Sequence, residues 1–524
     1  MACKNSIGTI ALSIISVSIL LGCSSNKQKP QGQLGEIDFA VTGKEEAQAD
    51  FKKAVLLLHS FEYADAAEEF QKVKKIDPDF VMAYWGETMT CNHPIWQEQD
   101  LDRGNEILNM LAPTADERRA KAKTELEKDF IGGVEILFGK GNKAERDSSY
   151  AVYMGILYKK YPGNDEVAAF YSLALNGWGV TEKDVSILEK AAAIGNEILK
   201  RNPQHPGAQH YIIHALDNPQ HAAQALTTAD SYAKTAPAAG HALHMPTHTY
   251  LALGLWDKVI SSNEVSWAAE RARKARKNLD NDALGYHSFH WLQYGYLQQG
   301  QKEKARSMVD SMLVFYKGKP SPRARAHMIL LKTTYVVEAN DFQKEIVDIS
   351  IEQKDLNLVA RTKDYFVKGM YAYYQKDGAK MDELIRNLAA ERLVEEAKTS
   401  DKGIRLCGNI NRSLPTKTDL QESEVMELEL RAMRAWLAND LIQAEKYFKA
   451  SLELQKAAGY AYGPPAIVKP AFEMYGEWLL ETGRPEQALK QFEESLKYAP
   501  NRFLSIKGKQ EAEQQIKSKA MAAL

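Results

Sequence analysis

The sequence has few cysteines, no excess of either charge and, after its first residues, no long apolar run. Of 4 cysteines in 524 residues, only Cys91 and Cys407 lie beyond residue 23, and their spacing matches no metal motif. They are compatible with one disulfide or with two separate thiols. The formal net charge is −2, which gives no concentrated basic face, so nucleic acid is not an expected partner.

Several catalytic motifs are also missing. The chain has no phosphate-binding loop, no G-x-G-x-x-G after a strand and no G-x-S-x-G turn. In HYIIH, Tyr211 stands where the H-E-x-x-H motif of metalloproteases places its general-base glutamate. These absences argue against the commonest nucleotide-binding, hydrolase and metalloprotease sites.

The first residues predict export and lipid attachment. Lys4 precedes an apolar run from Ile7 to Leu21, which is too short to span a membrane comfortably. The run ends in Leu-Leu-Gly-Cys at Cys23, which resembles the bacterial lipoprotein box, so we expect residues 1–22 to be a signal peptide and Cys23 to carry lipid. Residues 23–45 are polar and predict a flexible tether. The expected location is the cell envelope, at the outer membrane if the host has one.

The histidines that follow have a repeat spacing. His210 and His244 are 34 residues apart, and so are His214 and His248, which is the period of a tetratricopeptide (TPR) helix-turn-helix repeat. Small residues, aromatic residues and closing prolines recur at the same period near both ends of the chain, while no strand-like alternation is persuasive. The expected fold is all-α: a TPR-type α-solenoid, a right-handed superhelix of helix-turn-helix repeats.

The expected organisation has four parts after the tether. We predict N-terminal TPR-like helical repeats over residues 46–205, histidine-rich central repeats over 206–345, an irregular helical region with a long loop over 346–424, and C-terminal repeats over 425–524.

The histidines concentrate on the predicted concave face. In TPR proteins the second, fifth, ninth, twelfth and thirteenth residues of each first helix line the groove, and these positions share one helical stripe. Ten of the twelve histidines take such positions, against about two expected by chance. The predicted ligand groove comprises Trp85, Asn92, His93, His210, His214, His241, His244, His248, His287 and His290.

The groove supports two hypotheses. In the first, it binds a protein, peptide or small-molecule ligand, as concave repeat surfaces commonly do. In the second, it holds a divalent transition metal (Zn, Fe or Cu) in a hydrolase or oxidoreductase site, because imidazoles at i, i+4 on facing helices can converge on one ion. The candidate ligands are His210, His214, His244 and His248, with Asp217 as an oxygen donor. No catalytic residue is assigned.

Four longer blocks extend the resemblance. AYWGETMTCNHPIW, HPGAQHYIIHALDNP, HALHMPTHTYLALGLW and YGPPAIVKPAFEMYGEWLL resemble a bacterial subgroup of TPR proteins. The family resemblance implies the fold, and it implies protein or peptide binding more than any chemistry. The histidines differ from ordinary peptide-binding TPR grooves, which favour Lys, Arg and Asn.

Overall fold

A computed structural model describes residues 33–522, except residues 183, 399–414, 459 and 461. The predicted signal peptide, Cys23, Cys407 and most of the predicted long loop lie outside the described residues. Within them, the chain is predominantly helical, and its one sheet is an antiparallel pair, β1 (Asn92–His93) and β2 (Glu98–Gln99). The predicted all-α, TPR-type solenoid is confirmed. None of the described helices is both long enough and apolar enough to cross a membrane.

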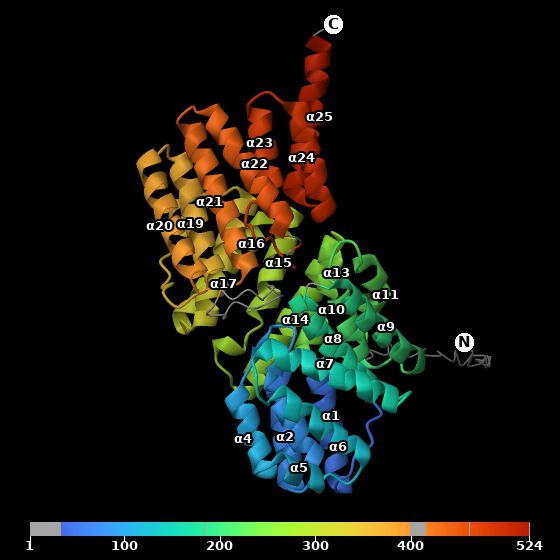
Figure 1. The fold of residues 1–524 in the computed structure, drawn as a ribbon. Helices are drawn as coiled ribbons and strands as arrows, with labels where there is room; N and C mark the ends of the chain where they lie inside the picture. The colour runs from blue at the N-terminus through green and yellow to red at the C-terminus, as the bar shows by residue number, and fades with distance from the viewer. Residues whose placement is uncertain (1–32, 183, 399–414, 459, 461, 523–524) are drawn as a thin grey trace, which may run out of the picture.

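The N-terminal helices form the lower half of the molecule in Figure 1. Consecutive helices pack on each other as pairs, beginning with α1 against α2 and ending with α8 against α9. The helices are α1 (Glu45–His59), α2 (Tyr63–Ile76), α3 (Val81–Met89), α4 (Leu101–Leu111), α5 (Ala115–Lys121), α6 (Glu125–Leu137), α7 (Lys143–Lys160), α8 (Asp165–Glu182) and α9 (Val185–Arg201).

The central helices join the two halves of the molecule. They contain the histidine-rich stretch and pack on one another in sequence order. They are α10 (Pro206–Ala215), α11 (Ala222–Thr235), α12 (Gly240–His244), α13 (Pro246–Ala252), α14 (Trp256–Lys277), the short 3-10 helix η1 (Asn281–Ala283), α15 (Tyr286–Gln298), α16 (Lys302–Gly318) and α17 (Pro322–Ala339).

The C-terminal helices form the upper half, from which α25 projects (Figure 1). The pairs α21/α22, α24/α25 and α23/α24 pack most closely here. The helices are α18 (Lys344–Val347), α19 (Leu358–Tyr374), α20 (Gly378–Glu396), α21 (Lys417–Leu437), α22 (Leu441–Ala458), α23 (Ala471–Glu481), α24 (Pro485–Tyr498) and α25 (Phe503–Ala522).

Small residues bring neighbouring repeats into contact. Ala54, Ala66 and Phe70 are fully buried where α1 meets α2, at the positions that the TPR pattern indicated. A Cβ on Gly86 of α3 would lie 2.1 Å from the ring of Phe70. The missing side chain therefore lets the third helix pack directly on the aromatic residue of the second, as in a close-packed protein interior.

The segment before α1 is packed against the repeats. Leu34 and Ile37 are buried, and the amide of Glu36 donates to the carbonyl oxygen of Gln204 at 2.9 Å. Phe39 lies in edge contact with Trp85, with ring centroids 5.8 Å apart. The predicted flexible tether is therefore wrong for its described second half, which buries apolar side chains against the helices.

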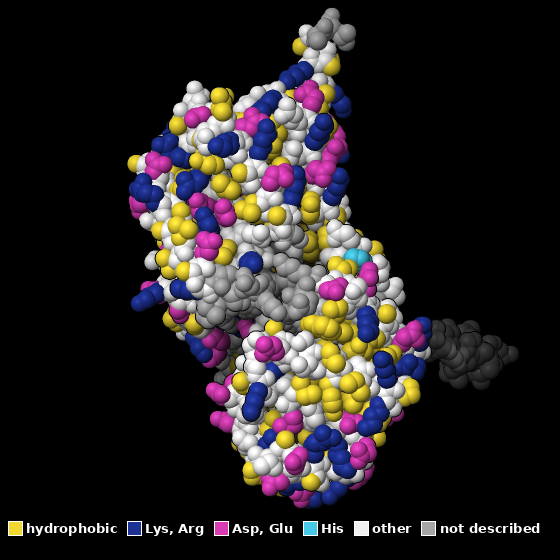
Figure 2. Space-filling model, viewed as in Figure 1, with side chains coloured by type: hydrophobic (Ala, Val, Ile, Leu, Met, Phe, Trp, Pro, Cys, Tyr) yellow, Lys and Arg dark blue, Asp and Glu magenta, His cyan; other side chains and the backbone are white. Residues whose placement is uncertain are grey.

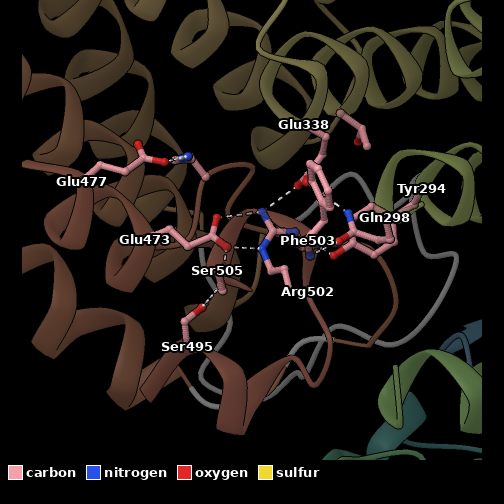
Figure 3. Close-up of polar contacts among 12 residues, drawn as sticks. Tyr294, Gln298, Glu338, Glu473, Glu477, Ser495, Arg502, Phe503 and Ser505 are labelled. Carbon is pink, nitrogen blue, oxygen red and sulfur yellow. Dashed lines mark hydrogen bonds and ion pairs between the residues drawn. The ribbon is translucent and has the colours of Figure 1, made fainter. Parts of the chain in front are cut away.

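The C-terminal repeats also contact the centre of the chain. Trp256 Nε1 donates to the carbonyl oxygen of Asn501 at 2.7 Å, across 245 residues of sequence. Beside this contact, the buried guanidinium of Arg502 donates to Tyr294 of α15 and is paired with Glu338 of α17 and Glu473 of α23 (Figure 3). The last helix pair is thus joined by polar contacts to the middle of the superhelix.

A buried histidine cavity as the candidate functional site

Six histidines from three successive first helices meet in the interior. α10 carries His210 and His214, α12 and α13 carry His241, His244 and His248, and α15 carries His287. The helix α11 separates α10 from α12 along the chain, so the 34-residue period places equivalent faces of α10 and α12–α13 side by side. His210, His214, His244 and His248 are buried and His241 and His287 are half-buried. Little histidine is visible on the one face drawn in Figure 2.

Prolines set the start of α10 and the boundary between α12 and α13. Pro206 stands at the first position of α10, where its missing N–H leaves no hydrogen bond unmade, and His205 caps the helix by accepting from the amide of Ala208 at 3.2 Å. Pro246 divides α12 from α13 because it cannot donate to the preceding turn. Met245 between them keeps helical angles (φ −52°, ψ −37°), so His244 and His248 stay on one stripe.

The first group of three lies between α10 and α12. One ring nitrogen from each of His210, His214 and His241 lies within 4.8 Å of the other two. The ring centroids of His210 and His214 are 4.9 Å apart, and those of His210 and His241 are 5.1 Å apart. Phe61, which follows α1 in a left-handed conformation (φ 56°), covers this group with its ring 4.2 Å from that of His210.

The second group lies between α12, α13 and α15. One ring nitrogen from each of His244, His248 and His287 lies within 4.8 Å of the other two. The His244 ring is 5.2 Å from His248 and 4.8 Å from His287. Trp291 packs against His248 at 4.6 Å on the side of α15. We call these groups the first and second histidine trios.

Hydrogen bonds at Nδ1 orient three of the rings. His210 Nδ1 donates to the carbonyl oxygen of His59 at 2.7 Å, and His244 Nδ1 lies 2.7 Å from Oδ1 of Asn263. His248 Nδ1 donates to Oδ2 of Asp217 at 2.5 Å. When Nδ1–H donates a hydrogen bond, Nε2 of the same ring keeps its lone pair. Metal-binding histidines usually have this arrangement.

In the described part of the chain, the Nε2 atoms of four histidine rings have no hydrogen-bond partner. They are Nε2 of His210, His214, His241 and His244, and all four atoms are buried. An unpaired polar atom in the interior costs free energy, and most proteins avoid it. Four such atoms lie together in two adjoining trios beside a cavity, so they are available to bind a ligand.

Burial keeps these imidazoles neutral. It lowers the pKa of His210, His214, His241 and His287 well below the ordinary 6.5, and neighbouring histidines lower it further. The pKa of His244 falls to about 3 for the same two reasons. Neutral imidazole is the form that coordinates a metal ion, so the rings are ready to act as ligands at physiological pH.

His214 and His241 of the first trio, together with the whole second trio, line a cavity of about 600 Å³ with aromatic and charged walls. Its size suits a small molecule as well as ions. His93 stacks on Tyr63 at one wall, with ring centroids 4.0 Å apart. The lining includes Phe61, Glu62, Tyr63, His93, Trp96, His214, His241, His244, His248, Glu270, Arg273, His287, Arg323 and His327.

Two carboxyl groups lie close together in the cavity wall. Burial raises the pKa of Glu270 to about 8, and the nearby Glu62 carboxylate adds to the shift. Oε1 of Glu270 would be 2.1 Å from a Cβ on Gly240, so the glycine at the start of α12 makes room for this carboxyl group. Glu62 accepts a hydrogen bond from the amide of His241 at 2.9 Å.

A third group of titratable residues has a structural role. Glu166 lies between His59 and His205, with Oε2 2.8 Å from Nε2 of His59 and Oε1 3.2 Å from Nε2 of His205. The other nitrogens are also engaged, since His59 Nδ1 bonds Tyr211 at 2.9 Å and His205 caps α10. Because both carboxylate oxygens and all four ring nitrogens have partners, this cluster ties α1, α8 and α10 together.

The structure places some predicted groove residues elsewhere. Trp85 is wrong as a groove residue, because it is fully buried among Phe39, Phe130 and Phe170. Asn92 lies outside the histidine cavity, where its side chain accepts from Lys143 at 3.3 Å. His290 is buried against Thr334, with Nε2 2.9 Å from the hydroxyl, and does not line the cavity.

Sequence spacing suggested Asp217 as an oxygen ligand. In the structure its Oδ2 accepts from Nδ1 of His248, so this carboxylate supports a ligand ring. Conversely, His241 and His287 join the trios although they were predicted only as groove residues. Phe61, Glu270 and Arg323 were missed altogether. Phe61 lies in a turn, Glu270 lies on the second helix α14, and Arg323 lies at the start of α17, before the positions that the groove rule covers.

The fold and the cavity define an all-α helical-repeat protein with a buried, histidine-lined site. No known family model matches the chain, and no curated protein matches its sequence. Among solved structures, it is similar to the Cut9–Hcn1 hetero-tetramer of the APC/C, with 12% identity over 93% of this chain and 79% of that one (TM-score 0.36).

Two further structures are similar at the same level. A Rap protein complexed with competence and sporulation factor shares 13% identity over 79% of this chain and 99% of its own (TM-score 0.35). Yeast Tom70 shares 12% identity over 91% of this chain and 96% of its own (TM-score 0.33). These similarities are too low to carry a function from those proteins to this chain.

Proposed function

We propose that the protein binds a transition-metal ion through the histidine trios of its central cavity. The observation that carries this proposal is the set of four buried Nε2 atoms without a hydrogen-bond partner among the described residues. Metal coordination satisfies these atoms, whereas hydration of every ring would require several ordered waters. The Nδ1 contacts of His210, His244 and His248 supply the second shell that metal-bound histidines usually have.

The donor set selects the class of metal. Each trio offers three imidazole nitrogens and contains neither a carboxylate nor a thiolate. Imidazole suits Zn, Cu and Fe, while Mg and Ca prefer oxygen ligands. The remaining cavity volume leaves space for a small molecule beside the ion, so a polar or peptide ligand in the groove is compatible with bound metal.

The proposal includes a place in the cell. The lipoprotein box ending at Cys23 supports attachment of the mature chain to a membrane of the bacterial cell envelope, through lipid rather than a spanning helix. The polar residues directly after Cys23 give the helical repeats some reach from that surface.

Metal analysis of the purified mature chain tests the function. Titration with Zn²⁺ and Cu²⁺ is expected to show tight binding that is lost when His214 and His244 are both replaced by Ala. The control is His221→Ala, because this ring lies outside the cavity and is partly exposed beside Glu189. A folded, metal-free protein that binds neither ion would overturn the proposal and leave binding of a polar organic ligand or peptide.

A metal-dependent hydrolase or oxidoreductase is the second candidate. Glu270 favours an enzyme, because its carboxyl group lines the same cavity and burial raises its pKa to about 8. A carboxyl group that holds its proton near neutral pH can act as a general acid beside a metal-bound ligand. Loss of turnover in Glu270→Gln with unchanged metal content would support an enzyme, once a substrate is found.

A further inference from the structure

We propose that the cavity holds two copper ions, one bound by His210, His214 and His241 and the other by His244, His248 and His287. This inference rests on the proposed function and goes beyond it by naming the metal and the number of ions. The two trios have the same composition, and each brings three ring nitrogens within 4.8 Å of one another.

The helix spacing favours two ions over one. A metal–imidazole bond is about 2.0–2.1 Å long, so three nitrogens spread evenly around one ion are about 3.6 Å apart. The nitrogens of each trio lie within 4.8 Å of one another, so a closing movement of roughly 1 Å brings them to this separation. His210 and His287, by contrast, belong to α10 and α15, which lie on either side of α12–α13. Because neighbouring helix axes are about 8–10 Å apart, one ion cannot collect all six nitrogens.

The two sites adjoin. His241 and His244 stand three residues apart on α12, and each belongs to a different trio. The ring centroids of His241 and His244 are 6.1 Å apart, and those of His214 and His248 are 5.4 Å apart. Two ions held on either side of these contacts are near enough to share a small bridging ligand, as in other two-metal sites.

The charge and donor type favour copper. Divalent copper binds most tightly to nitrogen ligands among the first-row divalent ions, and imidazole suits it. Neither trio contains an anionic side chain, so two divalent ions would bring four positive charges into a buried site. Copper also binds as the monovalent cuprous ion, and two cuprous ions bring half that charge, which lowers the cost of burying them. Asp217, hydrogen-bonded to His248, is the carboxylate that directly supports a ligand ring.

The number of bound ions is tested by anaerobic titration of the mature chain with Cu(I) against a coloured competing chelator. The wild-type chain is expected to bind two equivalents. His210→Ala with His214→Ala removes the first trio and is expected to leave one equivalent, and His244→Ala with His287→Ala is expected to do the same for the second trio. His221→Ala, outside the cavity, is expected to keep two.

Two checks keep this result decisive. Each variant is compared with wild type by circular dichroism before titration, and Gln replaces Ala wherever an Ala variant is unfolded. One equivalent in the wild type, lost in both double variants, overturns the two-ion site but leaves metal binding intact. Two equivalents of Zn²⁺ with weaker binding of copper overturn the choice of metal. Binding of no metal at all overturns the proposed function as well.

Discussion

The carboxylate of Asp217 accepts a 2.5 Å hydrogen bond from Nδ1 of His248, although the two residues belong to different repeats and are 31 positions apart. Both side chains are nearly fully buried. The bond fixes the His248 ring with Nε2 as its acceptor nitrogen and increases the basicity of that nitrogen. Asp217 therefore joins two repeats and makes His248 a stronger metal ligand in the second trio.

Asp217→Asn is expected to weaken metal binding about 10–100-fold while leaving the fold intact, because the amide can still accept the hydrogen bond without the negative charge. Calorimetric titration with Cu²⁺ or Zn²⁺ measures the change. Asp230→Asn is the matched control, since Asp230 bonds Tyr250 and Lys258 away from the trios. Equal affinities for the wild type and Asp217→Asn would show that the carboxylate does not act on a ligand.

Gly207→Ala is expected to destabilise the protein by about 1–3 kcal/mol through overpacking. A Cβ at this position would lie 2.4 Å from Nδ1 of His59, and that ring is held by Glu166 and Tyr211. Urea unfolding measures the loss. In a His59→Ala background the collision is absent, so most of the penalty should disappear, and a penalty of the same size there would contradict the explanation.

Arg502→Met is expected to cost about 3–5 kcal/mol, because it leaves the Glu338 and Glu473 carboxyl groups buried without their cation. The guanidinium is fully buried and lies 2.6 Å from Glu473 and 2.7 Å from Glu338 (Figure 3). Chemical denaturation gives the free energy of unfolding. Lys509→Met, which removes a half-exposed ion pair with Glu493, should change it by less than about 1 kcal/mol.

Glu429→Gln is expected to stabilise the protein above pH 4.5. Burial raises the pKa of Glu429 well above its ordinary 4.5, against the smaller opposing effect of Lys469. Between these pKa values the folded state holds a proton that the unfolded state releases, so wild-type stability falls as pH rises. The difference between variant and wild type should grow by about 1.4 kcal/mol per pH unit.

Thermal and urea unfolding at pH 4.5, 6 and 7.5 measure this dependence. The variant and the wild type should be nearly equal at pH 4.5 and diverge at higher pH. Glu453→Gln, an exposed carboxylate on α22, provides the control and should show no such trend. A difference that does not change with pH would mean that Glu429 is ionised in the folded protein.

Cys23→Ser is expected to move the protein from the membrane fraction to the soluble fraction, because a single lipid attachment site provides the proposed anchor. Cell fractionation and labelling with radioactive palmitate measure the change. Unaltered circular dichroism of the purified variant would show that folding is independent of the lipid. Persistent label in Cys23→Ser would show that the lipoprotein box was misread.

The repeat period predicted much of the site because it fixes both the helix and the face. Two histidine pairs at the same 34-residue interval had to lie on equivalent stripes of neighbouring helices, and the structure brings His214 within 5.4 Å of His248. The periodicity could not divide the histidines into trios. That division depends on how far α12 and α15 approach each other, which is a property of tertiary packing.

The groove rule failed where another segment covers the inner face. Trp85 occupies an inner position of α3, but Phe39 from the extended segment before α1 packs on it. The tether was predicted from the polar residues 24–33, whereas the apolar side chains of Leu34, Ile37 and Phe39 that follow were the signal that this segment packs on the helices. Glu270 was likewise missed, because its importance comes from a glycine on another helix that admits its carboxyl group.

The hydrogen bond between Trp256 and the carbonyl group of Asn501 closes a loop of 245 residues. An open repeat array can lose its terminal helices one pair at a time, since each repeat contacts only its neighbours. In this protein the terminal pair, α24 and α25, is hydrogen-bonded to the middle of the chain. Its unfolding would therefore also expose the surface around Trp256 and Tyr294. The C-terminal helices should therefore unfold in a single cooperative transition. Deletion of α24 and α25 should destabilise the residues near position 256 as well as those at the new C-terminus.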